Sequence, residues 1–415
     1  MSTNNNTPQL RFPEFSGEWE EKKLGEVCER ITDKVGNLYL EPISVSAGIG
    51  IISQKQRFGK DISGVQYKNY IHIKKGDYCY NKGNSKRFPQ GCIYELKDFE
   101  EAAAPNAFIS FRFNNTMCPQ FFNGYFDSNA HGKQLAKFIT SGARADGLLN
   151  LNAEDFFKIK FYVPPTRAEQ QKIAQCLTEM DNLITAQGHI VEALKEKKKG
   201  LMQQMFPQQG ETTPRLRFPG FSGEWGKTTL GEIADKKNRR NNKQEVTRVL
   251  TNSANSGIVD QSDYFDRDIA VKGNTDNYFI VEIDDFVYNP RISTAAPVGP
   301  ISINRVGRGI MSPLYTVFKF HTGYIPFYEQ YFQTTIWHTY LKSIANYGAR
   351  FDRMNITTEG FFNMPLLLPT PSEQQKIAEF LSSLDDLIAA ETAKLETLKD
   401  HKKGLMQQLF PQTIK

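Results

Sequence analysis

The sequence is poor in the residue groupings that hold disulfides and metal ions. Its five cysteines are widely scattered among 415 residues, and neither a Cys-x-x-Cys pair nor a cluster of cysteine with histidine occurs. A disulfide framework and a structural zinc site are therefore not supported. No apolar run approaches the ~18 residues of a membrane helix, and the N-terminal stretch lacks the charged-then-apolar pattern of a signal peptide. We expect a cytoplasmic protein with no membrane association.

Motifs of catalysis and nucleotide binding are also missing. Gly226-Lys227-Thr228 resembles the end of a phosphate-binding loop, but Phe221 stands where the first glycine is required. Asn289-Pro290 begins like an adenine methyltransferase motif, and Arg291 ends the match. The six histidines form no H-x-x-x-H pair. We therefore interpret the chain as non-catalytic and expect it to hold no metal and no cofactor.

What is present is the composition of a folded protein with a slightly basic balance. Hydrophobic residues make up 39% and charged residues 23%, which is typical of a globular chain rather than a disordered one. The formal net charge is +5. That charge permits a polyanionic partner but does not require one.

An internal repeat dominates the sequence. The stretch 10–19 (LRFPEFSGEW) recurs at 216–225 (LRFPGFSGEW), and each copy is followed by Leu-Gly-Glu. Residues 169–207 and 373–411 are identical at 23 of 39 positions, from EQQKIA to KKGLMQQ(M/L)FP. Between these segments lie two regions that barely match. We infer one fold used twice, whose similar segments meet the same environment twice; neutral drift of loops is the alternative.

The two similar segments near 169–205 and 373–409 have the apolar period of a coiled coil. Apolar residues recur at steps of four and three, and polar residues interrupt both copies at the same two places, Gln187 and Lys198 in the first copy and Glu391 and Lys402 in the second. The first helix, near 169–205, connects the first diverged region to the second, whereas the second helix, near 373–409, has no further region to reach. We therefore predict that the two helices pair in antiparallel fashion. The alternative is that each helix packs only on the globular region that precedes it, which we call its head. The predicted seam comprises Ile173, Leu177, Met180, Ile184, Val191, Leu194, Ile377, Leu381, Leu384, Ile388, Leu395 and Leu398.

The diverged regions predict mixed heads rich in short strands. Alternating apolar residues indicate strands at 71–74, 78–80, 108–113, 279–283 and 315–320, and helical pieces are expected at 119–138 and 325–344. The predicted fold class is therefore α+β: two mixed α/β domains joined by two long helices that form an antiparallel coiled coil, in a pseudo-twofold tandem duplication. The predicted domains are 1–163, 164–207, 208–368 and 369–415.

Several loops of the heads combine basic and amide side chains. Lysine and arginine neutralise phosphates, arginine pairs with guanine, and asparagine pairs with adenine, so this mixture suits double-stranded DNA. Any one such loop is also compatible with an ordinary solvated surface. The candidate DNA contacts are Arg57, Lys60, Lys82, Asn84, Lys86, Arg87, Lys237, Arg239, Arg240, Asn242, Arg291 and Arg350.

On its paired LRFPxFSGEW openings and EQQKIA…KKGLMQQ(M/L)FP helices, the whole chain resembles the specificity subunit of Type I restriction–modification systems. The resemblance implies that each head is a target-recognition domain for one half of a bipartite DNA sequence and that the helices set the spacer. It also implies two methyltransferase subunits docked on the repeated segments, and restriction subunits beyond them. S-adenosylmethionine, ATP and magnesium are expected on those partners rather than on this chain.

Two other functions stay open at this point. One is a coiled-coil scaffold whose two heads bind proteins, which would show no salt-dependent affinity for DNA. The other is a self-sufficient methyltransferase or nuclease of unfamiliar sequence, which would bind its cofactor without partners.

Overall fold

The computed structural model describes residues 6–83, 85, 88–139, 149–264, 275–346 and 352–411. They divide into two units, and each unit takes part of both long helices. Unit 1 is Met1–Gly188 with Ala393–Lys415, and unit 2 is His189–Thr392. The predicted domains are four consecutive segments of the chain, each with one whole head or one whole helix. The two units instead each contain one head and part of both long helices. We call residues 6–163 head 1 and residues 208–368 head 2, within the described ranges.

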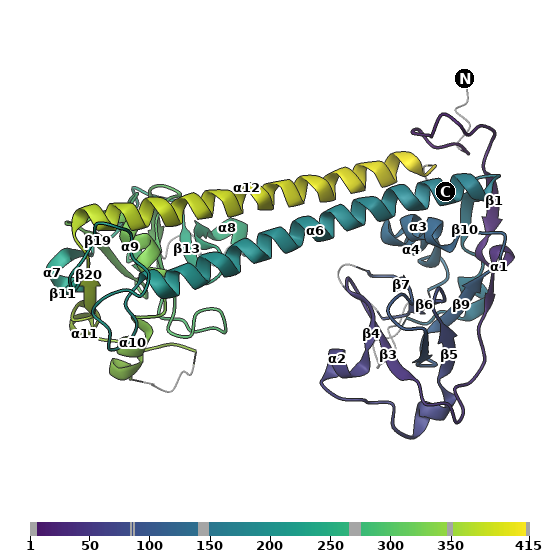
Figure 1. The fold of residues 1–415 in the computed structure, drawn as a ribbon, viewed down its shortest axis with the longest axis horizontal. Helices are drawn as coiled ribbons and strands as arrows, with labels where there is room; N and C mark the ends of the chain where they lie inside the picture. Colours follow the sequence, from purple (N-terminus) through teal and green to yellow (C-terminus); the bar gives the residue numbers. More distant parts are fainter. Residues whose placement is uncertain are drawn as a thin grey trace. The chain divides into compact units, whose positions relative to one another are not determined.

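Head 1 is built from two four-stranded sheets and a two-stranded one (Figure 1). The first sheet has the order β2-β9-β6-β7, the second has the order β4-β3-β8-β5, and β1 pairs with β10. The strands are β1 Glu20–Lys23, β2 Cys28–Arg30, β3 Glu41–Ser46, β4 Gly50–Ser53, β5 Ile71–Lys74, β6 Tyr78–Asn81, β7 Cys92–Glu95, β8 Glu101–Ala104, β9 Ile109–Phe113 and β10 Lys160–Val163. The short helices are α1 Leu24–Val27, α2 Gln54–Phe58, η1 Gly64–Asn69, η2 Pro119–Phe122, α3 Asn123–Asp127, α4 Ala130–Leu135 and α5 Ala153–Phe156.

Head 2 repeats the first of these sheets with different loops. Its four-stranded sheet has the order β12-β19-β16-β17, and the pairs β11-β20, β13-β14 and β15-β18 accompany it. The strands are β11 Gly226–Thr229, β12 Ala234–Lys237, β13 Leu250–Ser253, β14 Gly257–Asp260, β15 Phe279–Val281, β16 Phe286–Tyr288, β17 Ile301–Ile303, β18 Gly309–Met311, β19 Thr316–Phe320 and β20 Pro365–Leu368. The helices are α7 Leu230–Ile233, α8 Gln261–Tyr264, α9 Ile325–Phe332, α10 His338–Ile344 and α11 Thr358–Phe362.

The two long helices are α6 Arg167–Met205 and α12 Pro371–Leu409, of 39 residues each. Each begins directly after a strand and a proline-containing turn, β10 before α6 and β20 before α12. The Thr166 hydroxyl accepts a hydrogen bond from the Glu169 amide at 3.3 Å, as an N-terminal cap does. The 3.5-residue period therefore predicted both helices correctly.

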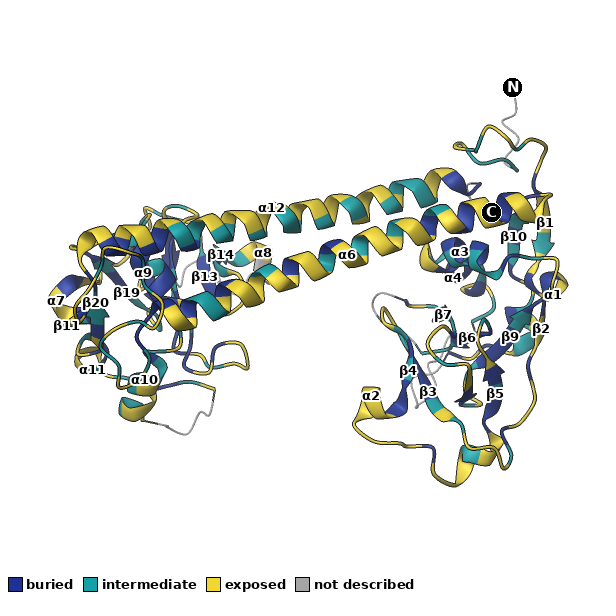
Figure 2. Cartoon of the chain, in the orientation of Figure 1, coloured by how far each residue is buried: buried dark blue, intermediate teal, exposed yellow. Residues whose placement is uncertain are grey.

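Each head's apolar core includes one end of both helices. In unit 1, Ile173 and Leu177 of α6 and Leu409 of α12 join a cluster with the aromatic residues of head 1. In unit 2, Met205 of α6 and Leu381 of α12 join the corresponding cluster of head 2. Figure 2 shows buried positions in dark blue where the helices meet each head. The alternative in which each helix packs only on its own head is therefore wrong.

The five predicted strands of the heads are present as β5, β6, β9, β15 and β19. The two predicted helical regions are also present, each as a set of short helices. The 119–138 region contains η2, α3 and α4, and the 325–344 region contains α9 and α10. Within the described ranges, no helix combines the length and the apolarity needed to cross a bilayer.

Candidate functional site

The loops that follow β6 and β16 are closed by the same contacts in both heads. The Asn81 amide donates to the Val45 carbonyl at 2.7 Å, and its counterpart Asn289 donates to the Asn252 carbonyl at 2.9 Å. At the far end of each loop stands a glycine with positive φ, Gly91 at +83° and Gly299 at +79°. A Cβ on Gly299 would lie 2.0 Å from the Asn289 carbonyl oxygen, so no side chain fits there. The base of each loop is therefore fixed, while the residues between can differ.

The predicted DNA contacts of head 1 differ in exposure and in hydrogen bonding. Arg57 is exposed, but its guanidinium donates to the Ser44 hydroxyl and the Val45 carbonyl, both at 2.9 Å, and so holds α2 against β3. Lys60 is exposed and Lys82 is half-buried at the end of β6. Asn84, Lys86 and Arg87 lie outside the described residues. The sequence alone could not reveal the inward contacts of Arg57, because its two acceptors lie on β3, more than ten residues before it in the chain.

Head 2 gathers exposed basic residues around the end of β12. Lys237, Arg239 and Arg240 are exposed, as is Asn242. Arg239 forms an ion pair with Glu245 at 3.0 Å, and Arg240 donates to the Asn277 side chain at 2.7 Å. Arg350 lies outside the described residues.

Arg291 stands apart from that cluster. It is exposed just after β16, and its backbone amide is held by the Asn289 side-chain oxygen at 3.0 Å. A cavity of about 380 Å³ lies beside it, lined also by Asn252, Tyr278 and Tyr315. An arginine at the rim of a cavity can present its donors to the edge of a base.

The basic loops singled out from the sequence do not include three arginines of head 2: Arg248, Arg305 and Arg308. Each forms an ion pair: Arg248 with Asp260 at 2.6 Å, Arg305 with Glu329 at 2.7 Å, and Arg308 with Glu282 at 3.2 Å. The hydrogen bond from Arg248 holds the pKa of Asp260 below its usual value. These pairs offset much of the positive charge, so the surface is mixed in sign rather than uniformly basic. These three arginines were not predicted, because they lie outside the basic and amide-rich loops of the sequence.

The repeated openings and the repeated helix starts bind each other. Arg11 donates through two nitrogens to the Glu169 carboxylate, both at 2.8 Å, and Arg217 donates in the same way to Glu373, both at 2.7 Å. Both carboxylates are almost completely buried, at 1% side-chain exposure. Part of the repetition is therefore explained by contacts within the chain, which the sequence pattern alone did not reveal.

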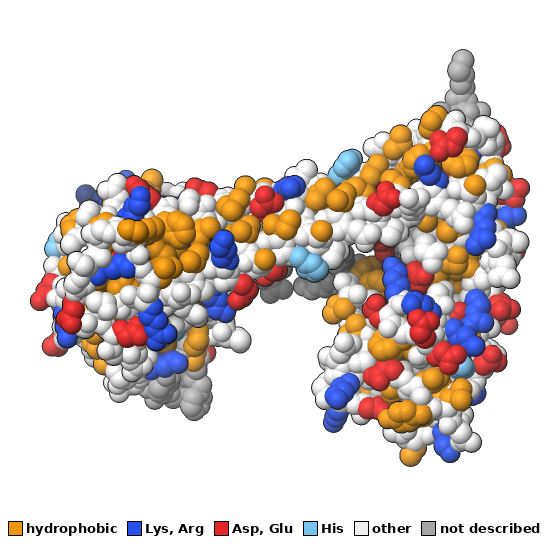
Figure 3. All heavy atoms as spheres, viewed as in Figure 1, with side chains coloured by type: hydrophobic (Ala, Val, Ile, Leu, Met, Phe, Trp, Pro, Cys, Tyr) orange, Lys and Arg blue, Asp and Glu red, His pale blue; other side chains and the backbone are white. Residues whose placement is uncertain are grey.

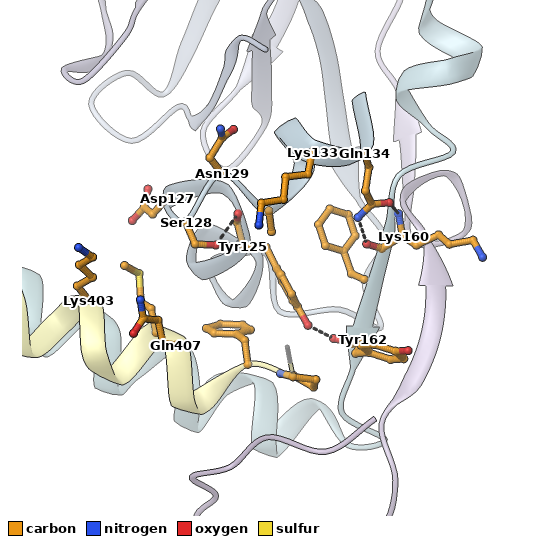
Figure 4. A pocket seen from close by; sticks show the side chains of 15 residues that line it. Tyr125, Asp127, Ser128, Asn129, Lys133, Gln134, Lys160, Tyr162, Lys403 and Gln407 are labelled. Atoms are coloured by element: carbon orange, nitrogen blue, oxygen red, sulfur yellow. Dashed lines mark hydrogen bonds between the residues drawn. The ribbon is translucent and has the colours of Figure 1, made fainter. Parts of the chain in front are cut away.

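A cavity lies where each head meets the repeated KKGLMQQ segment, and the two cavities share part of their lining. In unit 1 the cavity is about 530 Å³, and Figure 4 shows Lys403 and Gln407 of α12 facing Asp127 and Ser128 at the end of α3. In unit 2 the cavity is about 390 Å³. Its matching lining residues are Lys199, Met202 and Gln203 of α6, and Gln333, Thr334 and Thr335 after α9.

The long helices also expose apolar side chains, which Figure 3 shows in orange along them. Leu183 is 54% exposed, and Leu387, its counterpart in the second copy, is 43% exposed. Exposed leucines at matching places of both copies are consistent with a surface that a partner covers.

The predicted seam residues all lie on the less exposed side of their helices. Ile173, Leu177, Val191, Ile377 and Leu381 are buried. The remaining seam positions are half-buried: Met180, Ile184, Leu194, Leu384, Ile388, Leu395 and Leu398.

The cysteines have the environment of packing residues. Burial raises the pKa of the Cys79 thiol to about 12 and that of Cys92 to about 11, so neither forms a thiolate nucleophile near neutral pH. Among the residues that the structure describes, no three or more His, Cys, Asp or Glu side chains are grouped so as to hold a metal ion.

Comparison with known proteins gives one consistent result. The model of the family described as Type I restriction modification DNA specificity domain matches residues 16–196 and again residues 222–400. A protein of Methanocaldococcus jannaschii, provisionally named the MjaX specificity subunit of a type I restriction enzyme, is 24% identical over 99% of this chain and 97% of its own. The MjaVIII specificity subunit of the same organism is 23% identical over 68% of each chain.

Two solved structures share the fold. The crystal structure of a Type I restriction–modification S subunit from M. genitalium has a TM-score of 0.55 at 13% identity, covering 98% of this chain and all of its own (100%). A structure described as concerning complex assembly and conformational transition of the type I system has a TM-score of 0.53 at 17% identity, covering 97% of this chain and 100% of its own.

Proposed function

We propose that this chain, which belongs to the family of Type I restriction modification DNA specificity domains, recognises a bipartite DNA sequence. The chain is a DNA-recognition subunit, and catalysis falls to other subunits of the system. The observation that carries the proposal is that the family model matches twice, once over each head with its following helix. Two recognition domains in one chain suit a target of two separate blocks.

We infer that each head reads one block. The four-stranded sheet and the closed base of the loop recur in both heads, while the loop residues differ. Basic and amide side chains around β12 and after β16, together with Lys60 after α2, supply the chemistry for phosphates and base edges. A common frame with different loops is what two different sequence blocks require.

The two long helices, in this proposal, form an antiparallel coiled coil that sets the gap between the blocks. Support comes from each unit taken separately. Unit 1 brings the start of α6 and the end of α12 into one core, and unit 2 does the same with the end of α6 and the start of α12. The burial of the seam positions agrees with this pairing.

The repeated surfaces are the proposed docking sites for methyltransferase subunits, one on each copy. The lysine, methionine and glutamine that the repeated helix segment contributes to each cavity occur in both copies, as do the exposed leucines Leu183 and Leu387, and this suits two copies of one partner. Restriction subunits would join this assembly in the cytoplasm. S-adenosylmethionine, ATP and magnesium would be bound by those partners.

Salt dependence of binding separates this proposal from a protein scaffold. The complex with methyltransferase subunits should bind duplex DNA, and its affinity should fall by about 10³-fold or more between about 50 and 200 mM salt. Substituting Gln for Lys237 and Arg239 should make the slope of log affinity against log salt shallower by about one for each phosphate that is no longer neutralised. The matched control is Lys172→Gln, an exposed lysine of α6 outside the two cavities. No DNA affinity, or an affinity insensitive to salt, would favour the scaffold.

A further inference from the structure

Each long helix carries one buried lysine within its apolar seam. In unit 2, the Lys198 side chain is only 7% exposed, whereas that of its neighbour Lys199 is 66% exposed. The Lys198 ammonium donates to both carboxylate oxygens of Asp385 on α12, at 2.5 and 2.7 Å, and to the Gln333 side chain after α9 at 2.7 Å. Lys198 therefore joins its own helix, the other helix and the head. We call this the Lys198 contact.

The same arrangement occurs in unit 1 with the roles of the helices exchanged. The Lys402 side chain of α12 is 14% exposed, and its ammonium donates to Asp181 of α6 at 2.7 Å and to Asp127 of α3 at 3.2 Å. Burial acts to lower the pKa of Lys402, but the two carboxylates more than offset this and raise it. This is the Lys402 contact. Two equivalent three-way contacts, one in each unit, are not an accident of one local environment.

A buried lysine paired with a carboxylate adds little to stability. Its desolvation offsets most of the attraction to the carboxylate, and apolar residues of similar volume are often at least as stable in such places. A charged group in an apolar seam instead penalises every alignment that leaves it unpaired. The polar interruptions of the seam therefore need a reason other than stability.

Slipped alignments remove the aspartate from the position opposite each lysine. If α12 moved by one heptad in unit 2, Lys198 would face Ala378 or Thr392 instead of Asp385. The same slip in unit 1 would place Lys402 opposite Ala174 or Gly188. One heptad is about 10 Å of helix, or about three base pairs of DNA, so slippage would matter to a protein that measures a gap.

We propose that Lys198 and Lys402 are positioning residues that hold each helix pair and its head in one alignment, and that they thereby restrict the gap length accepted between the two DNA blocks. This inference rests on the proposed function. Neither lysine is required to touch DNA, and neither is part of the surfaces assigned to the reading of bases.

The test measures gap selectivity separately from block recognition. The full chain carrying Lys198→Met and Lys402→Met is assembled with methyltransferase subunits, and methylation is measured on a DNA library that holds both blocks constant and varies the gap. We expect the thermal midpoint to be unchanged or higher. The preference for the wild-type gap over its neighbours should fall about tenfold, while the two blocks stay the same. Lys198→Arg with Lys402→Arg should keep the wild-type gap.

The controls separate the possible failures. Lys172→Met with Lys376→Met changes exposed lysines at matching positions of α6 and α12, outside the cavities proposed for docking, and should leave gap selectivity as in the wild type. If the Lys198 and Lys402 variant behaves like this control, the inference is wrong. If that variant does not assemble, Asp385→Asn with Asp181→Asn removes the charges at half-exposed positions, and unchanged gap selectivity there overturns the inference. A wild-type complex that methylates without a fixed gap would instead contradict the proposed function.

Discussion

At the scale of single residues, the repeated motifs are explained first by what they bind inside the chain. Glu169 and Glu373 start the repeated helices, and each is buried against an arginine of the repeated opening, Arg11 or Arg217. The sequence showed that both motifs recur, but it could not show that they meet, since more than a hundred residues separate them. Repeated motifs can therefore be similar because they form the same contacts inside each unit, as well as because they bind the same partner.

Removing either arginine should destabilise its own unit. Arg11→Ala leaves the Glu169 carboxylate buried without its cation, which costs about 3–5 kcal/mol of unfolding free energy in unit 1, and Arg217→Ala should do the same in unit 2. Urea denaturation followed by tryptophan fluorescence measures the loss. Arg215→Ala removes an exposed pair with Glu211 and should cost less than about 1 kcal/mol. Equal losses for Arg11 and Arg215 would show that burial does not govern this contact.

Acid should weaken unit 1 through His131. Burial lowers the pKa of this fully buried imidazole from 6.5 to about 4, so the unfolded chain takes up the proton first. The associated stability is complete above pH 6.5 and is lost as the pH falls towards 4, by about 3 kcal/mol at 1.36 kcal/mol per unit. Urea midpoints at pH 7, 5.5 and 4 should fall less steeply in His131→Leu than in the wild type. An unchanged pH profile in that variant would be the contrary result.

At the scale of elements, periodicity predicted what is local and missed what is not. Steps of four and three located α6 and α12, and alternation located β5, β6 and β9, because each pattern depends on neighbours along the chain. The order β2-β9-β6-β7 joins strands that are distant in sequence, and no local pattern encodes it. The interruption at Lys198 was visible, but its partner Asp385 was not.

The exposed leucines of the helices predict how partners assemble. Leu183→Asp and Leu387→Asp should change the thermal midpoint little, since exposed substitutions usually shift stability by less than about 0.5 kcal/mol. Each should block one docking surface by placing a charge where an apolar contact is expected. Native mass spectrometry should find one methyltransferase subunit on each single variant and none on the double variant. Gln171→Asp is the exposed control, and full occupancy in the double variant would place docking elsewhere.

At the scale of the whole molecule, the duplication explains a target of two parts, because it gives one chain two recognition domains. Both the repeated frame and the diverged loops were visible in the sequence, and so was the family resemblance. The individual base contacts were not, because they depend on loop conformation. Arg57 illustrates this: it lies in a basic stretch but donates to Ser44 and Val45 of its own head. Arg291, exposed after the fixed base of its loop, is the stronger candidate.

The most direct measurement is modified-base sequencing of DNA from cells that express this chain with its methyltransferase subunit. We predict N6-methyladenine in a motif of two short blocks around one fixed gap. Arg291→Ala should relax one block and leave the other unchanged, since each head reads one block. Methylation within a single continuous block, or equal changes in both blocks in the Arg291 variant, would contradict the assignment of one block to each head.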